Sequence, residues 1–257
     1  MHRHVRVPAR VNIIGEHTDY AGGLALPFAV DCYLELTAKR TESDYIGDET
    51  VIDLWRCSGG WPVELEIKSD IPIGKGMSSS AALCLAIVLA VNDPIDQLKA
   101  CQEAQRIEHQ ILKTPCGLLD QMAMMYGKLN HASLIDFSQL SVKSIPIPKD
   151  WKFKLVDSGI NRNLSETQYD QTSQEEYIHQ ENERVKQALT ASPIELGKLL
   201  NQSHQYLTMI GVSTPEVDSL VKKLQHTDGV LGARMMGGGF GGMILVLVDS
   251  DSVLPNL

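Results

Sequence analysis

The chain has 257 residues, of which 43% are hydrophobic and 21% are charged. This balance is typical of a globular protein and excludes disordered, collagen-like and low-complexity classes. Lysine and arginine total 23 against 32 aspartates and glutamates, and the resulting net charge of -9 argues against a nucleic acid or an anionic membrane as partner.

The cysteines and the apolar segments indicate the cellular compartment of the protein. Five cysteines form no CxxC pair, and their irregular spacing is typical of reduced, buried thiols. No apolar run approaches the roughly 20 residues that span a bilayer. The first residues resemble a strand rather than a signal peptide. We therefore expect a cytoplasmic protein with no membrane partner.

Residues 1–70 are predicted to be rich in strands. Strand-like sequence covers 32–39, 51–55 and 63–68, and Gly59 and Gly60 separate the last two. An alanine-rich run over 81–91 follows three serines and predicts a buried helix with serine near its N-cap. Two more helices are expected, from Pro94 to about Leu112 and over 117–126.

After this, strands are predicted over 132–137 and 153–157, with prolines marking a boundary near 146–150. Helical periodicity covers 168–190, 194–209 and 215–226, and strands over 230–235 and 243–248 flank a glycine cluster. There is no internal repeat. This order favours an α+β fold in two lobes, which we place at 1–148 and 149–257.

A first polar motif, RVNIIGEHTDY, covers residues 10–20 and precedes a glycine-rich turn. It gathers Arg10, Glu16, His17 and Asp19 within a short stretch. Carboxylates accept paired hydrogen bonds from vicinal hydroxyls, so the pattern suits a polyol such as a sugar. Local chemistry alone fits a charged turn between strands equally well.

A second motif, IPIGKGMSSSAAL, covers residues 71–83. Free N–H groups at the start of the following helix would suit a phosphate, and the hydroxyls could bond a phosphate oxygen or Mg²⁺. The Walker A pattern does not occur in the chain. The alternative interpretation is a capped core helix with a flexible lead-in.

A third motif, GGGFGG, covers residues 237–242 and satisfies G-x-G-x-x-G literally. A dinucleotide-binding interpretation fails because a strand-like run follows it instead of a helix. A glycine run between two strands indicates close approach of its backbone to another loop or to a ligand.

Other polar residues are uninformative when taken singly. Glu108 and Asp120 lie on predicted helices, where carboxylates are usually solvated. His17, His109 and His131 lack the spacing of a zinc site.

Taken together, the three motifs resemble those of the GHMP small-molecule kinases, and EHTD followed by GGLALP resembles the galactokinases among them. The segments RIEHQILKTPCGLLDQM and DSGINRNLSETQY also resemble galactokinase sequence, so the resemblance covers about 6–248. It implies a two-lobed α+β GHMP-kinase fold, with a ribosomal protein S5 domain 2-like N-terminal lobe and a ferredoxin-like C-terminal lobe.

The resemblance implies a sugar 1-kinase that uses ATP and Mg²⁺ to phosphorylate galactose or a close relative such as N-acetylgalactosamine or L-arabinose. Asp120 and Arg10 would be catalytic. Mg²⁺ would be held by Glu108 with Ser79, or with its neighbour Ser80. The sugar would contact Glu16, His17, Asp19, Gly117 and Tyr169. The triphosphate would lie on Gly74, Lys75, Gly76, Ser78, Ser79 and Ser80, with 237–242 beside it.

The chain departs from this family by its shortness, between Asp19 and Gly74 and between Tyr169 and Gly237. The first segment normally includes elements beside the adenine. An acidic stretch over 170–176 stands where the family usually carries basic residues, and Lys75 is our candidate for the missing positive charge.

Other interpretations remain open at this point. The same fold could serve as a non-catalytic sugar sensor, or as a reduced kinase that binds sugar but transfers slowly. A mevalonate or homoserine kinase is disfavoured because those enzymes lack the Glu-His-x-Asp motif. The expected partners are a small-molecule sugar and a nucleotide, bound by a monomer or a homodimer.

Overall fold

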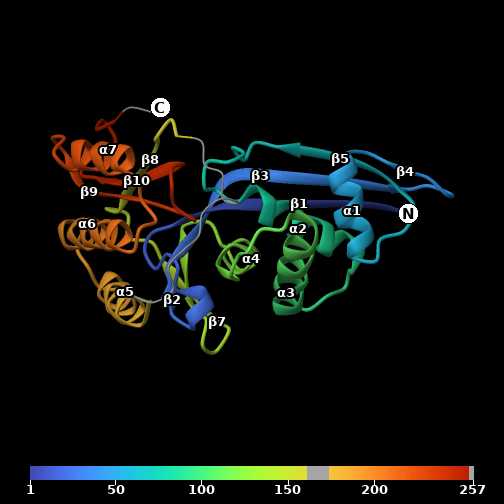
Figure 1. The fold of residues 1–257 in the computed structure, drawn as a ribbon, viewed down its shortest axis with the longest axis horizontal. Coiled ribbons are helices and arrows are strands. Elements are labelled where there is room, and N and C mark those ends of the chain that lie inside the picture. The colour runs from blue at the N-terminus through green and yellow to red at the C-terminus, as the bar shows by residue number, and fades with distance from the viewer. Residues whose placement is uncertain (161–173, 255–257) are drawn as a thin grey trace.

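The computed structural model describes residues 1–160 and 174–254, and within them the chain forms two antiparallel-dominated sheets with helices packed on them (Figure 1). The larger sheet has seven strands: β1 (His2–Asn12), β2 (Leu24–Ala25), β3 (Pro27–Arg40), β4 (Tyr45–Ile46), β5 (Val63–Ser69), β6 (His131–Asp136) and β7 (Ser141–Pro146). The smaller has three: β8 (Lys152–Asp157), β9 (Val230–Met235) and β10 (Met243–Val248).

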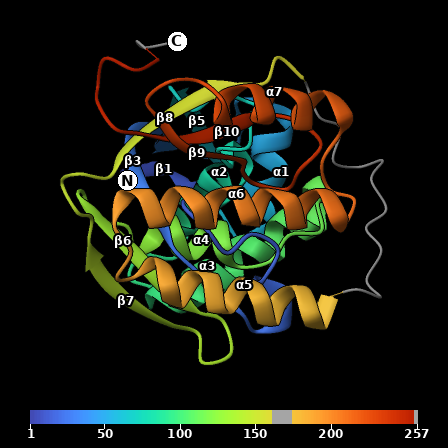
Figure 2. The same ribbon diagram turned by 90° about the vertical axis from the view of Figure 1, so that its left-hand side faces the viewer.

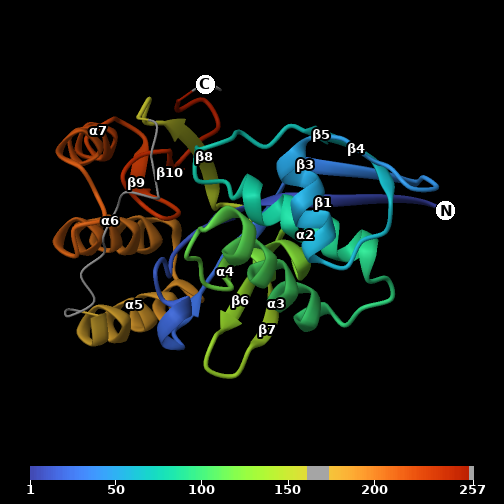
Figure 3. The same cartoon turned by 45° about the vertical axis from the view of Figure 1, so that its right-hand side comes forward.

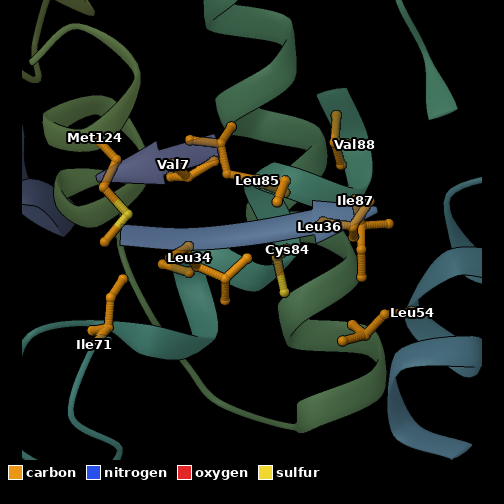
Figure 4. Packing of buried hydrophobic residues seen from close by; sticks show 14 of the residues in the cluster. Val7, Leu34, Leu36, Leu54, Ile71, Cys84, Leu85, Ile87, Val88 and Met124 are labelled. Carbon is orange, nitrogen blue, oxygen red and sulfur yellow. The ribbon is translucent and has the colours of Figure 1, made fainter. Parts of the chain in front are cut away.

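The larger sheet is centred on β3, which pairs with β1, β5 and β6. Helix α2 (Ser79–Val91) covers it, flanked by α1 (Glu49–Cys57), α3 (Gln97–Ile107) and α4 (Leu119–Met125). Because α2 is apolar on nearly every side, it is buried all round. Figure 4 shows Leu85 of α2 beside Val7 of β1 and Leu34 of β3, with Leu54 of α1 at the edge of the cluster.

The smaller sheet has β10 in the middle, antiparallel to β8 and β9. Helices α6 (Pro193–Met209) and α7 (Pro215–Gln225) pack against β9, and α5 (Gln174–Ala188) lies along α6, as Figure 2 shows. A capping box formed by Ser192 and Glu195 starts α6, with Pro193 in its first turn. In Figure 3, α5 lies on the side of the molecule that faces the turn between β1 and β2.

One predicted strand is wrong. Residues 51–55 belong to α1, in which Asp48 caps the helix by accepting a hydrogen bond from the N–H of Val51. The apolar residues that looked like a strand, Val51, Leu54 and Trp55, are buried at helical spacing. The cap and this spacing favour a helix over an extended segment.

The helix predicted from Pro94 begins later, at Gln97, where the Asp96 side chain caps it. Its last part, Glu108–Leu112, winds as a π-helical turn. Strand β7 was not predicted, since it alternates weakly and is mostly exposed. Residues 168–173 of the predicted third-to-last helix lie outside the described residues.

The remaining elements predicted in the described part of the chain are confirmed, including α2, α6, α7, β9 and β10. All strands of the larger sheet precede residue 147 and those of the smaller sheet follow residue 151, while the division at 148/149 stays a prediction. The five cysteines are free thiols. None of the helices in the described ranges combines the length and the apolar character needed to cross a bilayer.

Candidate active site

One cavity of about 830 Å³ brings the three sequence motifs together. The segments that line it come from the end of β1 and the turn after it, the start of α2, the region before and within α4, and the loop between β9 and β10. Of the predicted site residues, those in contact with this cavity are Arg10, Glu16, His17, Asp19, Gly74, Gly76, Ser78, Ser79, Ser80, Glu108, Gly117 and Asp120. Tyr169 lies outside the described residues.

An arginine and an aspartate form an ion pair at the cavity. Arg10, near the end of β1 and almost fully buried, places Nε 2.7 Å and Nη2 2.6 Å from Oδ1 of Asp120. Its Nη1 donates to the carbonyl of Gly76 at 2.5 Å. Two charge-assisted contacts from one planar group fix the carboxylate in position. The sequence segments of the first and second motifs are thereby joined to α4.

Ser78 starts α2 in an unusual way. Its backbone is left-handed, with φ of 59°, and its side chain does not cap the helix but contacts Oδ2 of Asp120. Ser78, Ser79 and Ser80 all line the cavity. The N-terminus of a 13-residue helix therefore faces the cavity without a side-chain cap from Ser78, an arrangement that suits a phosphate group.

Glu108 is a buried carboxylate beside this helix start, only 2% exposed. Ser80 donates to its Oε1 at 2.7 Å, and Gln121 donates to its Oε2 at 2.9 Å. Burial raises the pKa of Glu108, and the negative charge of Asp120 adds to this effect. A cation at this position would offset both causes.

The oxygen atoms of Glu108 and the neighbouring hydroxyl would suit a Mg²⁺ ion that takes its remaining ligands from a bound phosphate compound and water. A carboxylate and a hydroxyl are hard oxygen donors, and Mg²⁺ usually takes only one or two protein carboxylates and completes its shell with phosphates and water. Among the described residues, no three His, Cys, Asp or Glu side chains gather as a metal site. The hydroxyl adjacent to Glu108 is that of Ser80, the second of the two serines considered from sequence.

Asp19 and Gly117, which both line the cavity, lie against each other. The N–H of Leu119 donates to Oδ2 of Asp19 at 3.1 Å. A Cβ atom at Gly117 would lie 1.8 Å from that same oxygen, so any side chain there would displace the Asp19 carboxylate. Burial raises the pKa of Asp19 to about 6, and the nearby carboxylates of Asp120 and Glu16 contribute. His17, in a left-handed conformation, contacts the Tyr20 hydroxyl through Nδ1.

Glu16 links the first motif to the third. Its side chain is 3% exposed, and its Oε1 accepts a hydrogen bond of 2.7 Å from the N–H of Gly237. The same oxygen lies 3.2 Å from Nη2 of Arg234 on β9. Sequence reasoning missed Arg234, although a charged residue inside the apolar run of β9 could have indicated a buried partner.

The glycine cluster approaches the phosphate-loop candidate closely, as predicted. A Cβ atom at Gly242 would lie 2.7 Å from the carbonyl oxygen of Lys75, and the N–H of Met243 donates to that oxygen at 2.8 Å. The Lys75 ammonium itself does not line the cavity. It pairs with Asp157 of β8 at 2.8 Å and lowers the pKa of that carboxyl group.

The cavity also includes residues to which the sequence analysis assigned no role. Tyr20, Ile73, Thr114, Val212 and Phe240 contribute to its wall. Gln121 supports Glu108 from α4 without lining the cavity. Val212 lies outside all of the motifs, so only the fold reveals that it is close to them.

Comparison with known families matches three parts of the chain. A model described as the galactokinase galactose-binding signature matches residues 2–39, the GHMP kinases N terminal domain matches 45–128, and the GHMP kinases C terminal matches 183–256. The galactose-binding signature therefore contains the first motif and its carboxylates.

Individual relatives with high coverage support the match to this family. A galactokinase of Thermotoga maritima is 33% identical, with 95% of this chain and 88% of that protein covered. A galactokinase of Pyrococcus furiosus is 31% identical over 96% of this chain and 89% of its own length. The first alignment runs over 309 positions, more than the 257 residues present here, so that relative carries segments that this chain lacks.

Solved structures show the same relationship. Lactococcus lactis galactokinase complexed with galactose superposes with a TM-score of 0.84 at 26% identity, covering 98% of this chain and 87% of that one. The mevalonate kinase of Methanococcus jannaschii, at 20% identity and a TM-score of 0.72, shares the fold, with 96% of this chain and 91% of that one covered. The chain belongs to the galactokinase family of GHMP kinases and is a sugar kinase.

Proposed function

We propose that the protein transfers the γ-phosphoryl group of ATP to the anomeric C1 hydroxyl of galactose, giving the sugar 1-phosphate and ADP. The observation that carries this proposal is the Arg10–Asp120 ion pair, which lies between the carboxylates of the first motif and the serines that open α2. A sugar on one side and a triphosphate on the other would meet at Asp120.

The sugar side is supported by its acceptors. Asp19 and Glu16 offer carboxylate oxygens to vicinal hydroxyls, His17 supplies a ring nitrogen, and Gly117 leaves room where a side chain would collide with Asp19. The galactose-binding signature spans the first three of these residues. We extend the sugar contacts to Tyr169 from the family resemblance.

The phosphate side is supported by the uncapped start of α2. Gly74, Gly76 and the three serines would hold the triphosphate oxygens, and Glu108 with Ser80, or Ser79, would hold Mg²⁺. When bound, Mg²⁺ would neutralise charge on the β- and γ-phosphates. Lys75 would reach the triphosphate only after it leaves Asp157.

The chemistry follows from these positions. As the sugar oxygen bonds to the γ-phosphorus, its proton passes to Asp120, and the bond to the β-phosphate oxygen breaks, leaving ADP. Arg10 holds the acceptor carboxylate and offsets negative charge that spreads over the transferred group. Because phosphoryl transfer has a loose transition state, such positioning and charge compensation supply most of the catalysis.

A coupled ADP-release assay across a panel of aldoses, with and without Mg²⁺, tests this function. We expect turnover that depends on galactose and on Mg²⁺, and weaker turnover with N-acetylgalactosamine or L-arabinose. Galactose binding measured by calorimetry without any ADP release would refute the transfer and identify a sugar sensor.

A further inference from the structure

Arg234 is a fully buried arginine that contacts the first motif, residues 10–20, from the other half of the chain. This motif is called the sugar motif. It lies in β9, in the C-terminal part drawn in red in Figure 1, whereas the oxygen atoms that its guanidinium contacts all lie in the first motif. Its Nη1 donates to the carbonyls of Asn12 and Ile13, at 3.1 and 2.8 Å, and its Nη2 pairs with Glu16.

A buried guanidinium is costly unless its charge and its donors are satisfied. Here Nη1 reaches two carbonyl oxygens and Nη2 lies at ion-pair distance from one carboxylate, whereas Nε has no hydrogen-bond partner among the described residues. An ammonium group on a flexible stem could not present such a planar fork to three acceptors. The three acceptors lie within the sugar motif, at the end of β1 and just after it. Arg234 therefore fixes the direction in which the chain enters that motif.

Glu16 gains a defined orientation from the same contact. Its Oε1 receives the Gly237 N–H and faces Arg234, so both contacts fall on one oxygen. The Glu16 side chain also lines the cavity. This leaves Oε2 as the oxygen to accept a sugar hydroxyl, with its negative charge balanced from behind by the guanidinium.

Helix α5 also contacts the same motif and the strand that follows it. Tyr177 donates to the carbonyl of Glu16 at 2.7 Å, Glu181 accepts from the N–H of Gly15 at 3.0 Å, and Asn182 accepts from the N–H of Leu24 at 2.7 Å. Residues of both α5 and β9 therefore contact the sugar motif. The contact made by Arg234 places a positive charge beside Glu16, a residue that lines the cavity.

We propose that Arg234 is a positioning residue for the sugar: it orients Glu16 and the backbone before it, and so determines the affinity for the sugar rather than for the nucleotide. This inference rests on the proposed function, since it assumes that Glu16 contacts the sugar. In this role Arg234 acts through Glu16 and does not itself touch the reacting atoms.

The test compares R234M and R234K with wild type and with N201A. Asn201 accepts a hydrogen bond from the N–H of Ala233, the residue before Arg234, and has no described contact with the sugar motif, so it serves as a matched control for damage to β9. For R234M we expect the galactose KM to rise about tenfold or more, with the ATP KM changed less than about twofold. R234K should show the same split to a smaller degree, and N201A should show none.

A double-substitution cycle with E16Q separates positioning from general damage. If Arg234 acts through Glu16, R234M in an E16Q background should weaken galactose binding much less than it does in wild type. Calorimetric galactose affinity provides this readout without turnover, so it remains informative if wild type releases no ADP and the proposed transfer is wrong. Should R234M fail to fold, R234K carries the same cycle. Unchanged galactose affinity in folded R234K and R234M, equal increases in both KM values, or full additivity with E16Q would overturn the proposal.

Discussion

Replacing Asp19 by asparagine should stabilise the empty protein at neutral pH while weakening its sugar binding. The carboxyl group accepts a hydrogen bond from the Leu119 N–H, which an amide oxygen can also accept, so D19N removes the charge and keeps the contact. The charge itself is unfavourable in the empty site, because burial and two neighbouring carboxylates, those of Asp120 and Glu16, oppose it.

The magnitude follows from linkage. The pKa of Asp19 rises from 3.8 in the unfolded chain to about 6 in the folded protein. Because the folded state then binds the proton more tightly, the free energy of unfolding decreases as the pH rises from about 4 to about 6. The full difference corresponds to at most about 3 kcal/mol above pH 6, less where water in the cavity screens the charge.

Urea denaturation of wild type and D19N, without sugar, at about pH 4 and about pH 8 measures this effect. D19N should be more stable than wild type at the higher pH and nearly equal to it at the lower one, and its galactose KM should rise sharply. D157N is a control of opposite sign, because Lys75 lowers the pKa of Asp157. Removing this carboxylate should decrease the free energy of unfolding at neutral pH, and the decrease should disappear at acidic pH. A D19N advantage that is absent at pH 8, or the same at both pH values, would refute the reasoning.

Three further predictions concern the transfer step and its ligands. D120N should retain the fold and lose at least about a hundredfold in turnover, because the amide cannot take the hydroxyl proton; near-normal turnover in the ADP-release assay would remove Asp120 from the mechanism. E108Q should raise the Mg²⁺ concentration needed for half-maximal activity, measured by titration, whereas an unchanged requirement would place the ion elsewhere. K75A should raise the ATP KM if the ammonium leaves Asp157 for the triphosphate, and an unaltered KM would show that it stays on that carboxylate.

The structure brings the three sequence motifs to one cavity, whereas one of the elements around them was predicted wrongly. The three motifs each contain residues that line one cavity, because glycines, serines and clustered carboxylates are required by local chemistry as well as by the fold. By contrast, 51–55 was predicted as a strand because its apolar residues are compatible with either period over so short a segment. Only the Asp48 cap and packing on α2 decide for a helix.

The supporting residues could not be identified from local patterns. Glu181 and Arg234 are ordinary charged residues in a helix and a strand, and the contacts that link them to the first motif reach to the other end of the chain. Likewise, Lys75 lies in the phosphate-loop candidate by sequence, yet its ammonium group forms an ion pair with Asp157 in the folded protein. Such pairings depend on how α5, β8 and β9 sit against the first motif, which no single segment encodes.

The most direct test of the central claim is the position of the phosphoryl group on the product. The purified protein would be incubated with galactose, ATP and Mg²⁺, and the product examined by ³¹P and ¹H nuclear magnetic resonance. We predict a phosphorus resonance coupled to the anomeric proton, formed together with ADP and lost in D120N. A phosphate on another hydroxyl, or galactose recovered unchanged beside intact ATP, would contradict the account.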